Sequence, residues 1–348
     1  MKNAFDMTLA ELKTDLTENG FKPFRAAQVY KWMTKYTPVS EMSDLSNADR
    51  EKLAAAYDFQ PVKIADRLVS KDKSVKYIFL LSDGNVIEGA LMKQDYGNTI
   101  CVSTQVGCRM GCAFCASGIG GVVRNLTPGE MLAEVLAVNA DLGKTEEGHR
   151  NVTNIVLMGS GEPLDNYENV TKFLSLVSCP DGINISQRNI TLSTCGLADR
   201  IRKLADDGFS VNITISLHAT TDEIRKTIMP IAYKYSIDEI IDACNYYAEK
   251  TGRRTSFEYT MIKSSNMGHF DALRLTGIAK RAKAHINLIM LNYVKEKNVK
   301  GCTEAEAQKF CKKLTDAGVN ATIRRSKGGD VGGACGQLRR KYMENAHD

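Results

Sequence analysis

Three of the ten cysteines fall in one short stretch whose spacing suits a metal cluster. Cys108, Cys112 and Cys115 form a C-x3-C-x2-C pattern, with Phe114 directly before the last thiol. Three thiolates on one loop can bond three irons of a [4Fe–4S] cubane and leave the fourth iron without a protein ligand. That open iron can bind the amino and carboxylate groups of S-adenosylmethionine. The pattern therefore predicts a cluster that reductively cleaves this cofactor and produces a radical.

A zinc site is the alternative for the same thiols. Zinc in a structural site takes four Cys or His ligands, and no His lies near this stretch, but Cys101 lies upstream and could be the fourth ligand. A four-cysteine zinc site therefore stays open at this point. The cysteines scattered singly along the chain are typical of buried or inert thiols, and a reducing compartment disfavours a disulfide framework.

A glycine-rich turn is the second feature with chemical potential. Met158-Gly159-Ser160-Gly161-Glu162-Pro163 follows the strand-like residues 155–157. Glycines let the backbone approach a ligand closely, and the active sites of α/β barrels gather at the carboxyl ends of their strands. Glu162 could accept hydrogen bonds from a substrate ammonium. Alone, this sequence is equally compatible with an ordinary turn, but its place one βα unit after the cysteines predicts a cofactor site.

Alternating strands and helices are needed to position these residues. Thr127-Pro128-Gly129-Glu130 predicts a capping box that opens a helix. Strands alternating with helices indicate a parallel sheet, and this many units predict an α/β fold with a full or partial barrel. The strands are expected at 99–103, 154–158, 189–193, 211–217, 255–261, 285–291 and 320–324, and the helices at 127–141, 167–178, 197–207, 236–250, 268–283 and 303–317.

The region before the barrel has a different character. Three helical stretches are expected, from Thr8 to Gly20, from Phe24 to Tyr36 and from Asp44 to Tyr57. A small β ribbon follows over residues 62–92. The predicted organisation is an N-terminal helical accessory domain (1–60), a β ribbon or linker (61–94) and a core that ends in an active-site loop (95–348).

The composition sets limits on location and partners. The 348 residues are 43% hydrophobic and 25% charged, with no apolar run of about 18 residues that could span a membrane. The first residues lack the basic and apolar regions of a signal peptide, so we expect a cytoplasmic protein. A net charge of +5 is compatible with nucleic acid but does not single it out.

Further motifs point to a known family. The cluster loop and Gly161-Glu162-Pro163 resemble the radical S-adenosylmethionine (radical SAM) superfamily. Together with four more segments they resemble the dual-specificity RNA adenine-C2 methyltransferases, which modify adenine 2503 of 23S rRNA and adenine 37 of certain tRNAs. The resemblance implies a partial (β/α)6-type radical SAM barrel. The four segments are Cys101-Val102-Ser103-Thr104-Gln105-Val106-Gly107-Cys108, Arg124-Asn125-Leu126-Thr127, Ser216-Leu217-His218-Ala219 and Ala334-Cys335-Gly336-Gln337-Leu338.

The resemblance also implies which residues hold S-adenosylmethionine. Each of these residues, taken alone, could equally be a polar group at a strand end that satisfies the backbone, and His218 alone is more typical of a core histidine. The implied cofactor-binding residues are Gly161, Glu162, Ser193, Ser216, Leu217, His218 and Asn292.

Two cysteines outside the triad receive roles in the same way. C2 of adenine is an sp2 carbon without a lone pair, so transfer of a methyl cation cannot methylate it and a radical route is needed. In the family, one S-adenosylmethionine methylates a cysteine that maps to Cys335. A second is cleaved at the cluster, and its radical activates that S-methyl group for attack on C2. Cys101 then releases the covalently bound RNA by forming a disulfide with Cys335.

A proton acceptor is implied less directly. Glu88 lies upstream of Cys101 at the spacing of a family glutamate with that role. Cys101 could itself take the C2 proton, and a carboxylate in a β ribbon is usually only solvated.

RNA and an electron donor are the expected partners of a monomer. Phosphate contacts by basic residues give affinity without sequence information, although such a run is also typical of a solvated surface. The target adenine must leave its stack to reach a buried radical. The reductant would be a carrier such as flavodoxin or ferredoxin. The expected RNA contacts are Arg324, Arg325, Lys327, Arg339, Arg340 and Lys341.

Three other functions stay open. A related class methylates C8 of the same rRNA adenine, but Glu162-Pro163 and Ile323-Arg324-Arg325 favour the C2 class. A non-catalytic iron–sulfur protein that binds RNA would have no need of Cys101 and Cys335. A radical enzyme acting on a small molecule is the third.

Overall fold

The computed structural model describes residues 1–143, 150–263, 265–291, 299–324, 327–331 and 342. Asn292, Arg325, Cys335, Arg339, Arg340 and Lys341, all of them predicted above to bind cofactor or RNA or to catalyse, lie outside the described residues.

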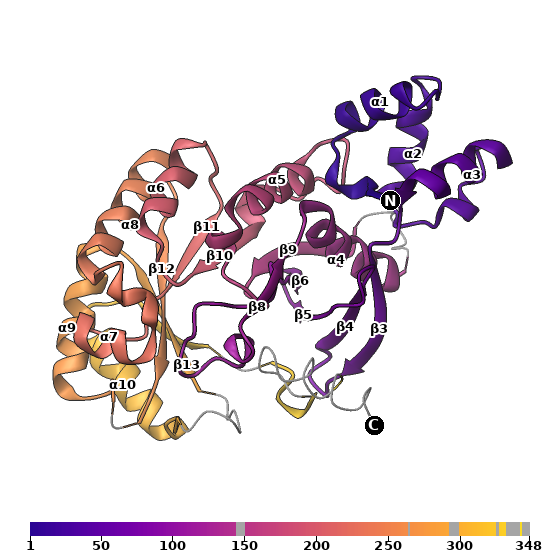
Figure 1. Ribbon diagram of the computed structural model, residues 1–348. Coiled ribbons are helices and arrows are strands. Elements are labelled where there is room, and N and C mark those ends of the chain that lie inside the picture. The colour runs from indigo at the N-terminus through magenta and orange to yellow at the C-terminus, as the bar shows by residue number, and fades with distance from the viewer. Residues whose placement is uncertain (144–149, 264, 292–298, 325–326, 332–341, 343–348) are drawn as a thin grey trace.

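Helices and strands alternate through the core, as the sequence predicts (Figure 1). The helices are α1 (Leu9–Glu18), α2 (Arg25–Met33), α3 (Asn47–Ala56), α4 (Pro128–Asp141), α5 (Tyr167–Ser178), α6 (Ala198–Asp206), α7 (Asp222–Ile228), α8 (Ile237–Thr251), α9 (His269–Arg281) and α10 (Glu304–Asp316). The strands are β1 (Lys2–Asn3), β2 (Tyr57–Asp58), β3 (Val62–Val69), β4 (Val75–Leu81), β5 (Val86–Gln94), β6 (Gly97–Cys101), β7 (Gln105–Gly107), β8 (Val122–Asn125), β9 (Val152–Leu157), β10 (Ile190–Thr194), β11 (Asn212–Ser216), β12 (Thr255–Met261), β13 (His285–Met290) and β14 (Ala321–Arg324).

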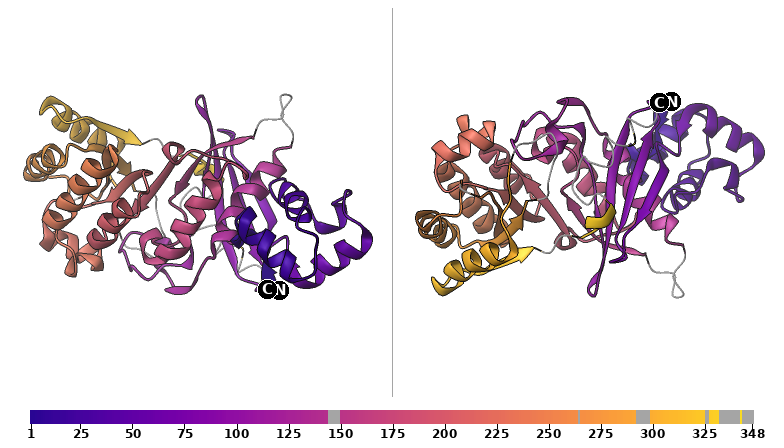
Figure 2. Two further views of the ribbon diagram at one scale, coloured as in Figure 1. Left: turned by 90° about the horizontal axis from the view of Figure 1, so that it is seen from above. Right: turned by 90° about the horizontal axis from the view of Figure 1, so that it is seen from below.

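One ten-stranded sheet forms the frame, in the order β14-β13-β12-β11-β10-β9-β6-β5-β4-β3. From β6 to β14 the neighbouring strands are parallel, and their connecting helices cover one side of the curved sheet (Figures 1 and 2). Within the described residues, β3 and β14 are the two edges, so the barrel is partial. The carboxyl ends of all the parallel strands therefore meet on one rim.

The β ribbon is not a separate unit. Strands β3, β4 and β5 are antiparallel to one another, and β5 pairs with β6 with Ala90 opposite Cys101. The ribbon thus extends the barrel sheet and places its inner face beside the first core strand. The sequence does not indicate this continuity, because the pairing partner of β5 depends on tertiary structure.

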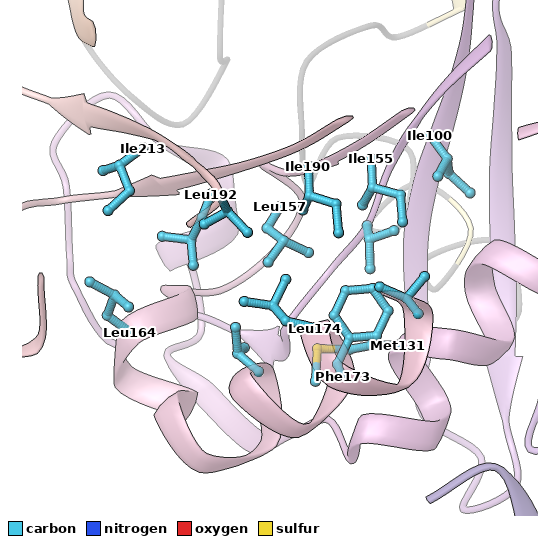
Figure 3. Close-up of a cluster of buried hydrophobic side chains, with 14 of the residues drawn as sticks. Ile100, Met131, Ile155, Leu157, Leu164, Phe173, Leu174, Ile190, Leu192 and Ile213 are labelled. Atoms are coloured by element: carbon cyan, nitrogen blue, oxygen red, sulfur yellow. The ribbon is translucent and has the colours of Figure 1, made fainter. Parts of the chain in front are cut away.

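The core lies between the parallel strands and the helices that cover them. Ile100, Ile155 and Ile190 occupy opposite positions on three adjacent strands, as do Leu157, Leu192 and Ile213 one step along. These side chains are 0–1% exposed and pack toward α4 and α5, where Met131, Phe173 and Leu174 meet them (Figure 3). Burial of such a row stabilises the sheet by about 1.5–3 kcal/mol for each side chain.

Helices α1 to α3 stand beyond the ribbon side of the barrel (Figure 1). The capping box predicted at Thr127 is confirmed and begins α4, and Thr8 forms another capping box at the start of α1. The short 3₁₀ helix η1 (Ala4–Asp6) packs against that same end of α4, where Asp6 Oδ1 accepts a hydrogen bond from Gly129 N at 2.7 Å. The N-terminal helices are therefore attached to the core at the beginning of α4.

Candidate active site

A cavity of about 390 Å³ opens at the carboxyl ends of the parallel strands. Its wall includes all three cysteines of the C-x3-C-x2-C motif, the 158–162 turn, Ser193, Ser216 and His218. The inner face of the ribbon closes another side through Lys76, Ala90 and Cys101. Residues from nine strands thus meet in one pocket of a size that suits a small cofactor.

A β hairpin fixes the base of the cysteine loop. Strands β7 and β8 flank the loop and pair antiparallel, and Cys108 N donates to Gly121 O at 3.0 Å. Gly107 has φ +83°, and a Cβ there would lie 2.1 Å from Gly121 O. Only glycine allows the two arms of the hairpin to approach this closely. The loop therefore leaves and re-enters the fold at one point.

The three thiols are held together on this loop. Cys115 N bonds Cys112 O at 3.2 Å, and Ala113 N bonds Ile228 O at 2.9 Å, which secures the loop to the end of α7. Burial raises the pKa of the Cys108 thiol and of the Cys112 thiol to about 12, and the Cys115 charge adds to both shifts. Bare thiolates are thus disfavoured, and a metal that binds here must displace the protons.

Their arrangement suits a cluster better than a single ion. Within the part of the chain that the structure describes, no three His, Cys, Asp or Glu side chains converge on one point, as a zinc ion requires. In a cubane held by three cysteines each thiolate bonds its own iron, so the sulfurs need not converge. The donor set is therefore that of an iron–sulfur cluster.

The glycine turn packs tightly against the first core strand. Gly161 has φ +112°, and a Cβ there would lie 2.6 Å from Thr104 Oγ1 and 2.8 Å from Gln105 N. A Cβ at Gly159 would similarly meet Ser103 Oγ and Val102 O at 2.7 Å. The two glycines are needed for this approach of one backbone to another, which holds the turn beside the cysteine loop.

Glu162 is buried, and both of its carboxylate oxygens have backbone partners. Oε1 accepts from Leu164 N at 3.0 Å and Oε2 accepts from Cys195 N at 2.7 Å. Burial raises the pKa of Glu162, while the bonds from Cys195 and Leu164 oppose the shift. The carboxylate thus joins the ends of β9 and β10, where the Thr194 and Cys195 side chains also hydrogen-bond to it.

Gln105 connects the two halves of the site, and the sequence analysis gave it no role. Its side-chain oxygen accepts from Glu162 N at 2.9 Å, and its Nε2 donates to Asn125 and to Asp165, each at 2.8 Å. Gln105 is completely buried. It therefore fixes the glycine turn relative to the hairpin below the cysteines.

His218 faces the cysteine loop from the end of β11. Its ring packs edge-on against the Phe114 ring, with the two ring centroids 4.8 Å apart. Its Nδ1 accepts a hydrogen bond from Thr260 N at 2.9 Å. Burial lowers the pKa of His218 to about 3, so the neutral ring carries its proton on Nε2. Leu217 behaves differently from its neighbours Ser216 and His218, because its side chain is fully buried and is not part of the cavity wall.

Cys101 lies on the ribbon side of the cavity in a row of facing residues. Lys76 is opposite Ala90 on the adjacent strand, and Ala90 is opposite Cys101 on the next. Opposite residues of neighbouring strands share one face of a sheet. The small Ala90 side chain leaves the space between the lysine and the thiol open to the cavity.

Glu88 is not the solvated ribbon carboxylate considered as an alternative above. Its side chain is 3% exposed and lies 3.2 Å from Lys76 Nζ, itself 5% exposed. Glu88 and Ala90 are two residues apart on β5, so they point to the same face of the sheet. A buried ion pair thus borders the row that contains Cys101.

Known proteins share this combination of fold and site. A model of the radical SAM superfamily matches residues 102–276, and one of the ribosomal RNA large subunit methyltransferase N-terminal domain matches residues 2–58. A protein named "Probable dual-specificity RNA methyltransferase RlmN" from Clostridium perfringens (strain SM101 / Type A) is 51% identical over 99% of this chain and 99% of its own length. One of the same name from Thermoanaerobacter sp. (strain X514) is 46% identical over 99% of each.

The chain belongs to the dual-specificity RNA methyltransferase RlmN family. A solved relative supports this membership: the crystal structure of a radical SAM methyltransferase from Sphaerobacter thermophilus has a TM-score of 0.92 and 36% identity, over 97% of this chain and 99% of that one. The predicted radical SAM fold is confirmed, and its cofactors are a [4Fe–4S] cluster and S-adenosylmethionine.

This RlmN-family site contains a second ion pair that the sequence did not reveal. Glu258, on β12, lines the cavity and is 9% exposed as a side chain. Arg324 Nη1 donates to Glu258 Oε1 at 2.7 Å and contacts Met158 Sδ at 3.6 Å. Arg324, predicted to meet RNA, therefore faces the cavity from the end of β14, as does Lys327 just beyond it.

Arg225 and Cys195 are further residues of the site that were missed. The Arg225 guanidinium is fully buried and donates to the carbonyls of Cys195, Leu217, Ser216 and Tyr235. It thereby ties the ends of β10 and β11 to the segment after α7. Cys195 lines the cavity, and burial, then the Glu162 charge, raises the pKa of its thiol. Neither residue stands in a recognisable motif, so only the tertiary structure identifies them.

Within the described residues, no helix of this RlmN-family chain is both long and apolar enough to cross a membrane.

Proposed function

We propose that the protein methylates C2 of adenine 2503 in 23S rRNA and of adenine 37 in tRNA. The observation that carries the proposal is the presence of Cys101 in the same cavity as the three cluster cysteines. A cluster alone needs no such thiol, whereas methylation of an unreactive ring carbon through a protein-bound intermediate does. The names of relatives that match along the full length support the same activity.

The cofactors would be held by the rim residues described above. Cys108, Cys112 and Cys115 would ligate the cluster. The cofactor S-adenosylmethionine would lie against Gly161, Glu162, Ser193, Ser216 and His218, and the family motif adds Asn292 to this set. When bound, these groups supply a methyl group and the radical needed to attach it to a carbon that is not nucleophilic.

We assign Cys335 the role of methyl carrier. Val331 lines the cavity, and Cys335 follows it by four residues in the chain. Four residues span at most about 14 Å, a separation short enough for the Cys335 thiol to be delivered to the cavity. The reach argument supports the assignment that the family motif implies.

Cys101 would release the product. Its thiol forms a disulfide with Cys335, and the RNA carbon leaves with its methyl group. Glu88, which forms a buried ion pair with Lys76, would accept the C2 proton. Leu217 would act through its backbone, because its side chain points into the core.

The partners follow from the same chemistry. The RNA would approach the rim with its adenine unstacked, and Lys327 with the basic residues that follow it would contact phosphates. The cluster takes its electron from a small carrier such as flavodoxin or ferredoxin. We further propose that the protein acts as a monomer in the cytoplasm, where its RNA substrates are.

Mass spectrometry of adenosine from treated RNA tests the proposal. Reconstituted enzyme, supplied anaerobically with reductant and S-adenosylmethionine, should convert a 23S rRNA fragment containing adenine 2503 to 2-methyladenosine. Exclusive 8-methyladenosine would contradict it and favour the C8 class. Failure to form 5′-deoxyadenosine would instead favour the non-catalytic RNA-binding function.

A further inference from the structure

The turn between β3 and β4 forms hydrogen bonds with residues 328–330. Asp330 Oδ1 accepts from Ser70 Oγ at 2.5 Å, and Asp330 Oδ2 accepts from Lys71 N at 3.1 Å. In the opposite direction, Asp72 Oδ2 accepts from Gly328 N at 3.0 Å. Each segment thus offers a carboxylate to a backbone amide of the other. We call Ser70, Lys71, Asp72, Gly328 and Asp330 the clasp.

The carboxylates of the clasp are charged at neutral pH. Hydrogen bonds from Ser74 and Gly328 hold the pKa of Asp72 well below its ordinary value, and bonds from Ser70 and Lys71 lower the pKa of Asp330. Hydrogen bonds to an ionised acceptor are roughly twice as strong as neutral ones. The ionised carboxylates therefore strengthen the hydrogen bonds that join the two segments of the clasp.

Both segments of the clasp continue into the cavity wall. The hairpin leads into Ser74 and Lys76, and the other segment contributes Lys327, Gly328 and Val331. The clasp therefore connects the ribbon side of the cavity to the chain just before Cys335.

We propose that Ser70, Asp72 and Asp330 are positioning residues, which hold residues 327–331 at the cavity and so limit where Cys335 can reach. This inference rests on the proposed function of Cys335. With the clasp closed, Cys335 is tethered five residues away at Asp330; with it open, the tether is the end of β14 at Arg324, eleven residues away. Effective concentration falls roughly as the −3/2 power of tether length, which predicts an about threefold loss.

Methylation of Cys335 is the step that should respond. This transfer forms one S–C bond at Cys335, breaks one S–C bond of the sulfonium and releases the thiol proton, so it needs no reductant. Its rate can be followed by mass spectrometry of the C-terminal peptide of the reconstituted enzyme. Equilibrium binding of S-adenosylmethionine to the reconstituted enzyme, measured separately without reductant, reports on the cluster and cofactor site alone.

The variants are Asp330→Ala, Asp72→Ala, Ser70→Ala and the double variant Ser70→Ala/Asp330→Ala. Asp66→Ala is the matched control, because Asp66 is exposed on the same ribbon and, among the described residues, its carboxylate accepts a hydrogen bond only from the adjacent Arg67 N. Asp330→Ala should methylate Cys335 up to about threefold more slowly, with S-adenosylmethionine affinity unchanged. The double variant should be little slower than Asp330→Ala, because the bond between Ser70 and Asp330 is already lost in that single variant.

Amide exchange in the protein without its cluster provides a readout independent of activity. Exchange at Lys71 should rise in Asp330→Ala and exchange at Gly328 in Asp72→Ala, and neither should rise in the control. Wild-type methylation rates despite raised exchange would overturn the proposal, and so would an equal loss of S-adenosylmethionine affinity. If the wild-type enzyme itself leaves Cys335 unmethylated, the proposed function fails instead.

Discussion

At the scale of single residues, His218 shows how the fold sets protonation beside the cysteine loop. Its ring contacts Phe114 and the backbone of Thr260. The His218 backbone has a positive φ of +56°. Asn266 Nδ2 donates to His218 O at 2.8 Å, which helps to hold this unusual backbone conformation. A neutral imidazole in a fixed orientation is therefore available at the cofactor site at any physiological pH.

We expect His218 to remain neutral from pH 5 to pH 8. Burial lowers its pKa from 6.5 to about 3, so the unfolded chain binds the proton first as the pH falls. The contribution of neutral His218 to the free energy of unfolding is therefore complete above about pH 6.5, and it is lost as the pH falls from about 6.5 to about 3. ¹⁵N NMR of the imidazoles, assigned with His218→Gln, should show one ring with an unchanging Nε2–H signal. Titration of that ring near pH 6.5 would contradict the buried geometry.

The sequence predicts residues that act through a local pattern and misses those that act through the tertiary structure. The cysteine triad and Glu162 stand in motifs whose spacing already restricts their chemistry. Gln105, Arg225 and Glu258 each bind partners far away in the chain, such as Asp165 for Gln105 and Arg324 for Glu258. A buried polar residue in a strand gives no sign of where its partner lies.

At the scale of elements, the turn after β9 depends on the absence of a side chain at Gly161. Positive φ alone costs a non-glycine residue about 1 kcal/mol, but here a Cβ would also collide with Thr104 and Gln105. Gly208 is a natural comparison, since it has φ +81° with no atom within 4 Å of its Cβ position.

Gly161→Ala should therefore destabilise the protein by roughly 3 kcal/mol, against about 1 kcal/mol for Gly208→Ala. Urea unfolding of the two variants measures the difference. Gly161→Ala should also lose 5′-deoxyadenosine formation, while Gly208→Ala keeps it. Equal destabilisation of both variants would mean that the turn does not depend on the close approach.

Long periodic elements were predicted well and short ones were not. The helix predicted at 167–178 and the strand predicted at 255–261 are found with the same bounds as α5 and β12. Helix α7 and the hairpin β7–β8 were not predicted. Each is only a few residues long and is stabilised by contacts with the cysteine loop, so neither has a hydrophobic period of its own.

At the scale of the whole molecule, the N-terminal helices are attached to the barrel by apolar packing and by polar contacts. Phe5 and Tyr30 belong to the same buried hydrophobic cluster as Leu132 of α4. Asp6 accepts from Gly129 N at the N-terminus of α4, where the helix dipole also favours a negative charge. Lys172 of α5 pairs with Glu11 of α1 at 2.7 Å. These contacts hold α1 to α3 beside the ribbon (Figure 2).

Removing the Asp6 carboxylate should loosen this attachment. We expect Asp6→Ala to lower the free energy of unfolding by about 1–2 kcal/mol, because Gly129 N loses its acceptor. Affinity for RNA should fall if the N-terminal domain contacts it, while 5′-deoxyadenosine formation without RNA should not change. The measurements are urea unfolding and RNA titration at fixed salt, with the exposed Glu18→Ala as control. Unchanged stability would show that this contact does not hold the domain.

The proposed methylation requires that Cys101 and Cys335, from distant parts of the chain, act on one RNA carbon in one cavity. Cys101→Ala tests this most directly, because the intermediate can form but cannot be released. Incubated anaerobically with RNA, reductant and S-adenosylmethionine, this variant should accumulate protein covalently bound to RNA, and mass spectrometry should locate the bond at Cys335. Normal turnover by Cys101→Ala, or an absence of any covalent complex while wild-type enzyme methylates RNA, would contradict the account.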